Sequence, residues 1–372
     1  MNPSYDVIIA GAGIIGAACA MECARGGLRT LVLERGSVGG ATTSAGMGHI
    51  VTMDDSEAQF ALTRYSRELW MAMRSQLPPE VEYRQRGTLW VATNEEEMAV
   101  VHSKQKFYQQ RGVRSQILDS KQVAEAEPNL RSGLAGGLLV PEDAVIYPPV
   151  AAKFFLEQAK QLGAELKLGV SVKSFLTEGG VQLADGSRVA ARYSVNALGP
   201  WSPDLTTGLP VRKRKGHLAI TAPMPGFVHH QIVELGYIKS AHSMDEDSVA
   251  FNIQPRVSGE LIIGASRQFN SEENNVEHAI VDRMVQRAIE FLPGLAKVPI
   301  THARAGQRAA TPDKLPIIGP SLNNEHIWLA TGHEGLGITT SLATGRLIAD
   351  LLLKRPTEIP TAPYSPARFA KT

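Results

Sequence analysis

Residues 5–34 read YDVIIAGAGIIGAACAMECARGGLRTLVLE and determine the fold of the first part of the chain. The apolar run 7–10 predicts a strand, and three glycines follow it with the spacing GxGxxG. Gly11 allows a tight turn out of the strand, Gly13 lets a pyrophosphate approach the backbone, and Gly16 lets the next helix pack against a sheet. The pattern predicts a strand–turn–helix unit that holds phosphates.

The helix predicted after this turn runs to about Arg25, and the second strand, 30–33, ends on an acid, Glu34. The helix N-terminus presents unpaired N–H groups and a partial positive charge to phosphates. Glu34 stands where a carboxylate can accept a hydrogen bond from a ribose 2′-hydroxyl and would repel a 2′-phosphate. The sequence therefore predicts an adenine-dinucleotide site, with NAD and FAD both open.

The charge balance excludes several classes of partner. The chain of 372 residues has 38 basic and 37 acidic side chains, a net charge of +1, so nothing favours nucleic acid or an anionic membrane. No apolar stretch reaches the roughly 18 residues of a membrane helix, and the run 7–20 follows Asp6 without the basic region of a signal peptide. We expect a soluble cytoplasmic protein of two closely joined domains.

Two cysteines, Cys19 and Cys23, lie four residues apart on one face of the first helix. Small thiols at this place fill space under a sheet, and one helix face supplies too few ligands for a metal. We therefore expect no metal site, no disulfide and no iron–sulfur cluster in this chain. Cysteine usage fits a reducing compartment.

A second glycine turn follows the predicted strand 326–330 near the C-terminus. It reads TGHEGLG (331–337) and opens a helix predicted from about Thr339 to Leu353. The positive end of this helix would point toward the cofactor. A reduced isoalloxazine carries negative charge near N1, whereas a nicotinamide becomes neutral on reduction, so the second turn favours FAD.

Three further segments carry expectations. The loop 36–50 is rich in glycine and hydroxyl groups, and we expect it to fold back over the pyrophosphate rather than lie free on the surface. The segment YSVNALG (193–199) predicts a buried parallel strand that ends at the ligand. The basic run 212–215 is interpreted as the exposed start of a strand, with a docking patch for an acidic partner or flavin phosphate as the alternative.

Several motifs together resemble one known family. GAGIIG with Glu34, GGATTSAGM, YSVNALGPW, LIIGASRQF, TPDKLPIIGP and TGHEGLGITTSLATGRLIADLL are similar to the D-amino acid oxidase-like FAD-dependent oxidoreductases, which include glycine oxidase and sarcosine oxidase. The wording of ATTSAGMGHIVTMDDS, VELGYIKSAHS, RAATPDKLPIIG and ATGHEGLGITTS resembles the beta subunit of D-hydroxyproline dehydrogenase and the related B subunits of opine oxidase. The match covers nearly the whole chain in the family's order.

The resemblance implies an α/β fold, in which a Rossmann-like FAD-binding domain joins a second, mostly antiparallel-sheet substrate domain, as in glycine oxidase. The FAD-binding domain would be discontinuous and comprise 1–80, 144–210 and 305–372. The substrate domain would comprise 81–143 and 211–304.

The implied chemistry is oxidation of the C–N bond of a small amino or imino acid by hydride transfer to flavin N5. No side chain is required as a general base, because the protein contributes orientation and electrostatics. Arg308 takes the position of the family's carboxylate-binding arginine. The resemblance also makes His333, His49 and Tyr237 substrate-binding candidates, with a structural role for the His333 turn as the alternative.

This chain departs from the family pattern at two places. Ala309 stands where the family often has proline, and Gly335 and Leu336 stand where glycine oxidase has a second polar residue of the turn. The substrate carboxylate would then be bound by Arg308 alone, or by Arg308 together with Tyr237 or His242.

The resemblance implies noncovalent FAD and leaves open a second flavin, FMN, at a subunit contact. The expected FAD contacts come from the two glycine turns, the loop after Glu34 and the ends of the neighbouring strands. They are Gly11, Ala12, Gly13, Ile14, Ile15, Gly16, Glu34, Arg35, Ala41, Thr42, Thr43, Ser44, Ala45, Gly46, Met47, Val172, Ala197, Gly199, Trp201, Gly306, Arg308, Gly332, His333, Glu334, Gly335, Leu336, Gly337, Ile338 and Thr339.

Among substrates, the resemblance points first to cis-4-hydroxy-D-proline, oxidised to a pyrroline carboxylate by the catalytic beta subunit of a heteromeric dehydrogenase. The partner subunits would be iron–sulfur and flavin or NAD proteins that accept the electrons. The alternatives are a self-contained glycine or sarcosine oxidase-like enzyme that makes hydrogen peroxide, an opine oxidase subunit, and a noncatalytic or NAD-binding Rossmann protein.

Overall fold

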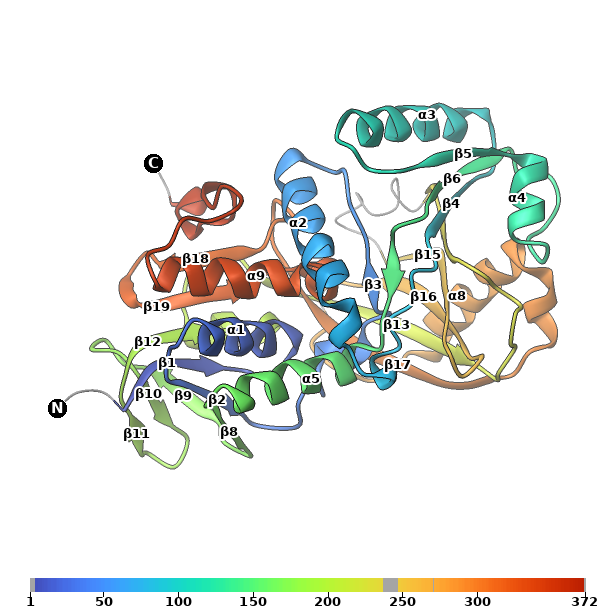
Figure 1. The fold of residues 1–372 in the computed structure, drawn as a ribbon. Coiled ribbons are helices and arrows are strands. Elements are labelled where there is room, and N and C mark those ends of the chain that lie inside the picture. The colour runs from blue at the N-terminus through green and yellow to red at the C-terminus, as the bar shows by residue number, and fades with distance from the viewer. Residues whose placement is uncertain (1–3, 237–246, 270, 371–372) are drawn as a thin grey trace.

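The computed structural model describes residues 4–236, 247–269 and 271–370, and two large sheets organise the described chain (Figure 1). The first sheet has six strands. In spatial order they are β18 (Ile317–Ser321), β19 (Asn324–Thr331), β12 (Ala191–Asn196), β1 (Tyr5–Ala10), β2 (Thr30–Glu34) and β8 (Glu165–Leu168). All neighbours pair in parallel except β18 and β19, which are antiparallel. This confirms the Rossmann-like α/β expectation.

Both faces of this sheet are covered, which explains the unbroken apolar runs of its central strands. Val7 and Ile9 of β1 pack in a cluster with the helices α1 (Ile14–Arg25) and α5 (Pro148–Gln161), whereas Ile8 packs on the opposite face with a small antiparallel sheet. The strands of that small sheet are β9 (Val172–Phe175), β10 (Val181–Leu183) and β11 (Arg188–Val189).

Helix α1 also packs against α9 (Gly337–Leu352), which in turn contacts α2 (Glu57–Met73) (Figure 1). The contact between α1 and α9 is close because small residues meet: a Cβ on Gly345 would lie 2.6 Å from the carbonyl oxygen of Ala18. The helices that follow the two glycine turns are therefore neighbours. Their N-terminal ends belong to one region of the molecule, although more than 300 residues separate them in the chain.

The second sheet has eight strands and is antiparallel apart from the β14–β4 pair. In spatial order they are β17 (Ile300–Ala310), β13 (Arg212–Thr221), β16 (Leu261–Arg267), β15 (Ser248–Pro255), β14 (Gln231–Glu234), β4 (Thr88–Ala92), β6 (Gly136–Val140) and β5 (Gln116–Asp119). Helix α8 (His278–Phe291) covers its outer face, where Phe291 stacks on Phe251 with ring centroids 4.5 Å apart. A mostly antiparallel second sheet is thus confirmed.

The remaining described elements connect or flank the two sheets. They are β3 (His49–Ile50), which pairs with β7 (Ala144–Val145), and the helices α3 (Glu95–Gln110), α4 (Ser120–Ala126) and α6 (Ser202–Leu205). Short 3₁₀ turns include 42–45 and 334–336. We refer below to the second sheet as the roof, because its strands β13, β15, β16 and β17 cover the cavity described in the next subsection.

One strand spans a domain boundary that was expected from the sequence. Strand β17 pairs with β13 over its whole length, from Ile300 to Ala310. Residues 305–310 therefore belong to the roof sheet, and the expected boundary at 305 falls inside a strand. Five short strands, β3, β5, β8, β14 and β18, were not expected. A strand such as β8, ELKL with mostly exposed side chains, has too few apolar residues to be recognised in sequence.

The basic run 212–215 differs from both of its expected interpretations. Arg214 and Lys215 are buried, and each makes an ion pair inside the protein: Arg214 with Glu334, and Lys215 Nζ with Glu277 at 2.7 Å. Lys213 pairs with Glu272 on the surface. The acidic partners are 59 or more residues away in sequence, so the run looked like an exposed patch although three of its four charges are paired within the fold.

Within residues 4–236, 247–269 and 271–370, no helix combines the length and the apolar character needed to cross a membrane. Cys19 and Cys23 are buried free thiols, and burial raises the pKa of Cys19 to about 12. Their burial agrees with the sequence, which assigned the cysteines to packing. The described chain has no group of three or more His, Cys, Asp or Glu side chains that could hold a metal ion.

Candidate active site

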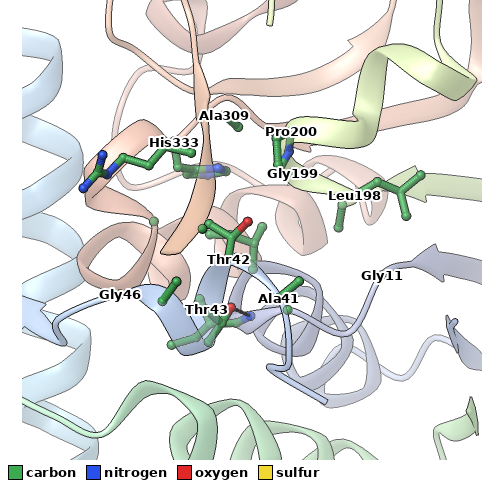
Figure 2. Close-up of a pocket in the computed structure, with 18 of the residues that line it drawn as sticks. Gly11, Ala41, Thr42, Thr43, Gly46, Leu198, Gly199, Pro200, Ala309 and His333 are labelled. Atoms are coloured by element: carbon green, nitrogen blue, oxygen red, sulfur yellow. Dashed lines mark hydrogen bonds between the residues drawn. The ribbon is translucent and has the colours of Figure 1, made fainter. Parts of the chain in front are cut away.

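A cavity of about 350 Å³ lies between the carboxyl ends of the parallel strands and the roof. Its wall contains the first glycine turn, the loop after β2, the end of β12 and the second glycine turn. Figure 2 shows the arrangement: Ala41, Thr43 and Gly46 face His333 and Ala309 across the cavity, with Gly199 and Pro200 at one side. In open α/β sheets, ligands bind at this end of the strands.

The first turn can be built only from glycine at two positions. Gly11 has φ +105°, and a Cβ there would lie 2.7 Å from the carbonyl oxygen of Ala197, at the end of β12. A Cβ on Gly16 would lie 2.0 Å from the carbonyl oxygen of Gly11, because helix α1 leaves the turn so closely. These contacts explain the motif spacing and hold the start of α1 against the cavity, which Gly11, Gly13, Ile14 and Ile15 line.

The loop 36–50 forms a wall of the cavity, as expected, and is anchored on both sides. The amide of Ile14 at the start of α1 donates a 3.0 Å hydrogen bond to Thr43 Oγ1, and Thr42 Oγ1 donates a 2.7 Å hydrogen bond to the carbonyl of Gln307 in β17. The loop therefore ties the helix N-terminus to the roof. This position explains its glycine and hydroxyl content better than a free surface loop does.

The carboxylate of Glu34 marks one end of the cavity. It accepts hydrogen bonds from the amides of Ala12 at 2.8 Å and Gly36 at 2.7 Å, which hold it at the carboxyl end of β2. Nearby, the guanidinium of Arg35 lies 4.9 Å from the centre of the Trp201 ring. An acid held by backbone amides and a cation stacked on an aromatic ring suit the ribose and base of an adenosine.

The second glycine turn forms the other end. Helix α9 begins at Gly337, and Gly335, Gly337 and Ile338 line the cavity, so the partial positive charge of a helix N-terminus faces it. Glu334 in this turn pairs with Arg214 of β13 and thereby joins the turn to the roof. His333 Nε2 is 2.9 Å from Thr344 Oγ1, and burial lowers the pKa of His333 to about 3.

We expect His333→Asn to flatten the acid side of the stability profile. The folded protein holds His333 neutral, whereas an unfolded chain takes up a proton below about pH 6.5, so this stabilisation is present above pH 6.5 and is lost as the pH falls toward 3. At pH 5 the loss is about 2 kcal/mol. Urea unfolding of the variant at pH 7 and pH 5 should differ by about 2 kcal/mol less than that of the wild type.

The control for this measurement is His302→Asn, since His302 is an exposed histidine of β17. It should keep the wild-type difference between the two pH values. An unchanged pH dependence in His333→Asn would contradict the neutral, buried state of His333.

Arg308 supplies a cation to the cavity wall at the roof. It lies on β17, and its side chain crosses the neighbouring strand at Gly216, where a Cβ would lie 2.1 Å from Arg308 Nη1. Nη1 donates a 2.9 Å hydrogen bond to the carbonyl of Ser266 in β16. The absence of a side chain at position 216 and this bond hold the guanidinium in one place, where its fork of N–H donors can meet a carboxylate.

His49 lines the same cavity. Its carbonyl accepts a 2.7 Å hydrogen bond from Thr339 Oγ1, which ties it to the first turn of α9. Burial lowers the pKa of His49 to about 3, so the ring is neutral at physiological pH. Nε2 of His49 is buried and has no hydrogen-bond partner among the described residues.

Most of the residues expected from sequence lie in the cavity wall. They are Gly11, Gly13, Ile14, Ile15, Glu34, Arg35, Ala41, Thr42, Thr43, Ala45, Gly46, Met47, His49, Val172, Ala197, Gly199, Trp201, Gly306, Arg308, His333, Glu334, Gly335, Gly337 and Ile338. Six expected residues lie beside the wall but outside it: Ala12, Gly16, Ser44, Gly332, Leu336 and Thr339. Tyr237 and His242 lie outside the described residues.

For three of these six exceptions the reasons are local. Gly16 packs on Gly11 and has no surface left for a ligand, and Thr339 Oγ1 bonds the backbone of His49. Ser44 Oγ bonds the carbonyls of Gly40 and Ala41. The motifs led us to expect that all their residues contact the ligand. In the fold, some motif residues instead hold the cavity-lining residues in place.

Sequence reasoning missed further lining residues. They are Leu33, Ser37, Gly40, Gly48, Val170, Ser171, Leu198, Pro200, Asp204, Leu205, Leu218, Asn252, Ala265, Ala309 and Ala330. Most are neighbours of predicted residues. Leu218, Asn252 and Ala265 come from three different roof strands, and only Asn252 carried a signal, as an amide within the apolar strand SVAFNI.

Comparison with known proteins agrees with this geometry. The family model described as FAD dependent oxidoreductase matches residues 6–351. The chain belongs to this FAD-dependent oxidoreductase family. It is 29% identical over 367 residues to a glycine oxidase of Bacillus licheniformis, covering 96% of this chain and 95% of that one. It is 27% identical to hydrogen cyanide synthase subunit HcnC of Pseudomonas aeruginosa, covering 99% and 97% of the two chains.

A solved structure supports the same assignment. The crystal structure of glycine oxidase from Geobacillus kaustophilus superposes with a TM-score of 0.89 at 26% identity and covers 99% of both chains. This family member is therefore an FAD-dependent oxidoreductase of the glycine oxidase type that acts on amino acid C–N bonds.

The residues present fit FAD. One continuous cavity has the Glu34 carboxylate at one end, the N-terminus of α1 in the middle, and the N-terminus of α9 with Arg308 at the other end. That order suits an adenosine, a pyrophosphate and a ring that gains negative charge on reduction. The two cysteines are outside this wall.

Proposed function

We propose that this enzyme is the catalytic subunit of a heteromeric dehydrogenase that oxidises cis-4-hydroxy-D-proline to a pyrroline carboxylate. The observation that carries the amino-acid part is Arg308, a cation held by Ser266 in the wall of a cavity whose other roof residues are small or apolar, such as Leu218 and Ala265, apart from the amide Asn252. A compact substrate with one carboxylate suits this surface.

In the proposed reaction the chain orients the substrate and excludes water. Arg308 binds the carboxylate, and the apolar residues Leu218, Ala265 and Met47 exclude solvent from the reacting carbon. Bound FAD, which we propose is noncovalent, supplies the hydride acceptor. His49 and His333, with pKa values lowered to about 3, are neutral and do not exchange protons at physiological pH.

We propose that the partner subunits carry the electron acceptor, as iron–sulfur and flavin or NAD proteins. A relative supports a subunit role for this chain. The hydrogen cyanide synthase protein, which the chain matches over almost its full length, is itself named as a subunit. The proposed dehydrogenase would then pass electrons out of this chain at a contact with another one.

Anaerobic bleaching of the flavin tests the proposed substrate. The purified yellow protein is mixed, without oxygen, with D-proline, L-proline, both 4-hydroxyproline epimers, glycine, sarcosine and opines. We expect cis-4-hydroxy-D-proline to bleach the flavin absorbance fastest. Bleaching by glycine or sarcosine alone would show that the hydroxyproline proposal is wrong.

The second candidate is a self-contained oxidase of the glycine oxidase type, which the 29% identity to a glycine oxidase favours. The two candidates differ in the electron acceptor. A dehydrogenase should reduce an artificial dye much faster than oxygen. Hydrogen peroxide formed by the isolated chain at the rate of dye reduction would instead establish the oxidase.

A further inference from the structure

Two polar side chains of the cavity wall have buried atoms without a partner among the described residues. Asn252 of β15 is 6% exposed, and its Oδ1 has no hydrogen bond within the described chain. His49 Nε2 is in the same situation. Leaving buried polar atoms unpaired is costly, so such atoms in a binding cavity indicate groups that a ligand will satisfy.

The two side chains lie in the same part of the wall. Gly48, beside His49, packs on β15: a Cβ there would be 3.3 Å from Nε2 of Gln254, which is two residues from Asn252 on the same face of the strand. Met47 reaches the adjacent strand, where its Sδ would be 2.8 Å from a Cβ on Gly264, the register partner of Asn252. His49 and Asn252 thus flank one corner of the cavity.

This corner lies close to the place where the Arg308 guanidinium is held. The guanidinium bonds Ser266 in β16, two residues along the strand from Gly264, and Gly264 pairs with Asn252 in β15. Two residues of strand span less than about 7 Å, and neighbouring strands are about 4.8 Å apart. A compact amino acid whose carboxylate is on Arg308 can therefore reach His49 and Asn252 with its side chain.

We propose that His49 and Asn252 form a subsite for a hydroxyl group on the side chain of the substrate. A hydroxyl donates one hydrogen bond and accepts others, and this matches an amide oxygen on one side and a neutral imidazole on the other. The inference rests on the proposed hydroxylated substrate and assigns the two residues that recognise its hydroxyl group.

The charges around His49 and Asn252 argue against a charged substituent of the substrate at this place. The cationic side chains of the cavity wall, within the described residues, are Arg35 beside Trp201 and Arg308 itself. Burial keeps the His49 ring neutral, with its pKa lowered to about 3. A second carboxylate, as in an opine, would stand uncompensated beside His49 and Asn252. Glycine, sarcosine and proline would leave both atoms unpaired.

The test compares D-proline with cis-4-hydroxy-D-proline in anaerobic stopped-flow reduction of the holoenzyme. We expect the wild-type second-order rate constant of flavin reduction to favour the hydroxylated substrate by at least about 100-fold, because a site that hydrogen-bonds a hydroxyl rejects the analogue lacking it. Asn252→Leu and His49→Phe should each lower that ratio at least about tenfold, mainly by weakening the hydroxylated substrate.

The matched control is Gln231→Leu. Gln231 is a buried amide of the same sheet, 2% exposed, whose Oε1 has no partner within the described chain, but it is outside the cavity wall. It should leave the ratio unchanged. If Asn252→Leu does not fold, Asn252→Ser keeps the test, since it shortens the polar group without adding apolar bulk.

A second readout separates this inference from the proposed reaction. Tetrahydrofuran-2-carboxylate and its 4-hydroxy derivative lack the oxidisable amine, and their dissociation constants follow from perturbation of the flavin spectrum. Tighter binding of the hydroxy derivative, lost in Asn252→Leu, supports the subsite. If in addition no amino acid bleaches the flavin, the proposed reaction is wrong but the subsite stands. A wild-type ratio near one, or an equal loss of both substrates in Asn252→Leu, overturns the subsite.

Discussion

Arg308→Met should lower kcat/KM for the amino-acid substrate by about 10²–10⁴-fold, since two charge-assisted hydrogen bonds to a carboxylate are together worth about 3–5 kcal/mol. The structure supplies the reason: Arg308 is in the cavity wall, and its bond to Ser266 at 2.9 Å holds the guanidinium before a ligand arrives. Steady-state kinetics with dye as acceptor measures the loss.

Arg308→Lys distinguishes geometry from charge. A lysine keeps the positive charge but lacks the planar fork, and it loses the bond that crosses Gly216 to β16. We expect it to fall between the wild type and Arg308→Met. The control is Arg212→Met, which removes an exposed arginine of the adjacent strand β13. Both Arg308 variants should purify with bound flavin.

A kcat/KM within about threefold of wild type in Arg308→Met would remove Arg308 from substrate binding. The proposed orientation of the substrate would then fail with it, because no other cation of the described cavity wall lies at the roof.

Gly16→Ala should weaken FAD binding by up to about 100-fold, the effect of about 3 kcal/mol of overpacking at the site. Its Cβ would stand 2.0 Å from the carbonyl oxygen of Gly11, so α1 must move away from the turn that it follows. The residues at the helix start, which line the cavity, move with it. Titration of apoprotein with FAD gives the dissociation constant, and the flavin absorbance of the purified variant gives its occupancy.

Gly27→Asn is the matched control at the other end of the same helix. Gly27 has φ +85°, and a Cβ there meets nothing within 4 Å. Asparagine tolerates this left-handed backbone at a cost of about 1 kcal/mol. The control should retain FAD with wild-type affinity, whereas full FAD occupancy in Gly16→Ala would show that the close packing of turn and helix does not support the cofactor site.

Local sequence determined the dinucleotide half of the site because its signals are short-range. The glycines of 11–16 must adopt a turn and permit close approach, and Glu34 ends the strand that follows the helix. The loop 36–50 and the turn 331–337 are recognisable for the same reason: their chemistry depends on backbone and small residues next to each other in the chain. The roof strands were recognisable as a class, except for the short strands β5 and β14.

Only the tertiary structure shows which side chains that are far apart in sequence contact one another. The sequence contains Arg214 and Glu334, or Lys215 and Glu277, as unrelated charges, and only the pairing of β13 with its neighbours makes them ion pairs. The side chains of the proposed hydroxyl subsite are more than 200 residues apart and become one corner of the cavity because the loop before β3 packs on β15. Sequence by itself indicated an adenine dinucleotide, since phosphate recognition is local, and its second glycine turn favoured FAD. The fold decided which side chains face the substrate, because that depends on the register of strands drawn from the whole chain.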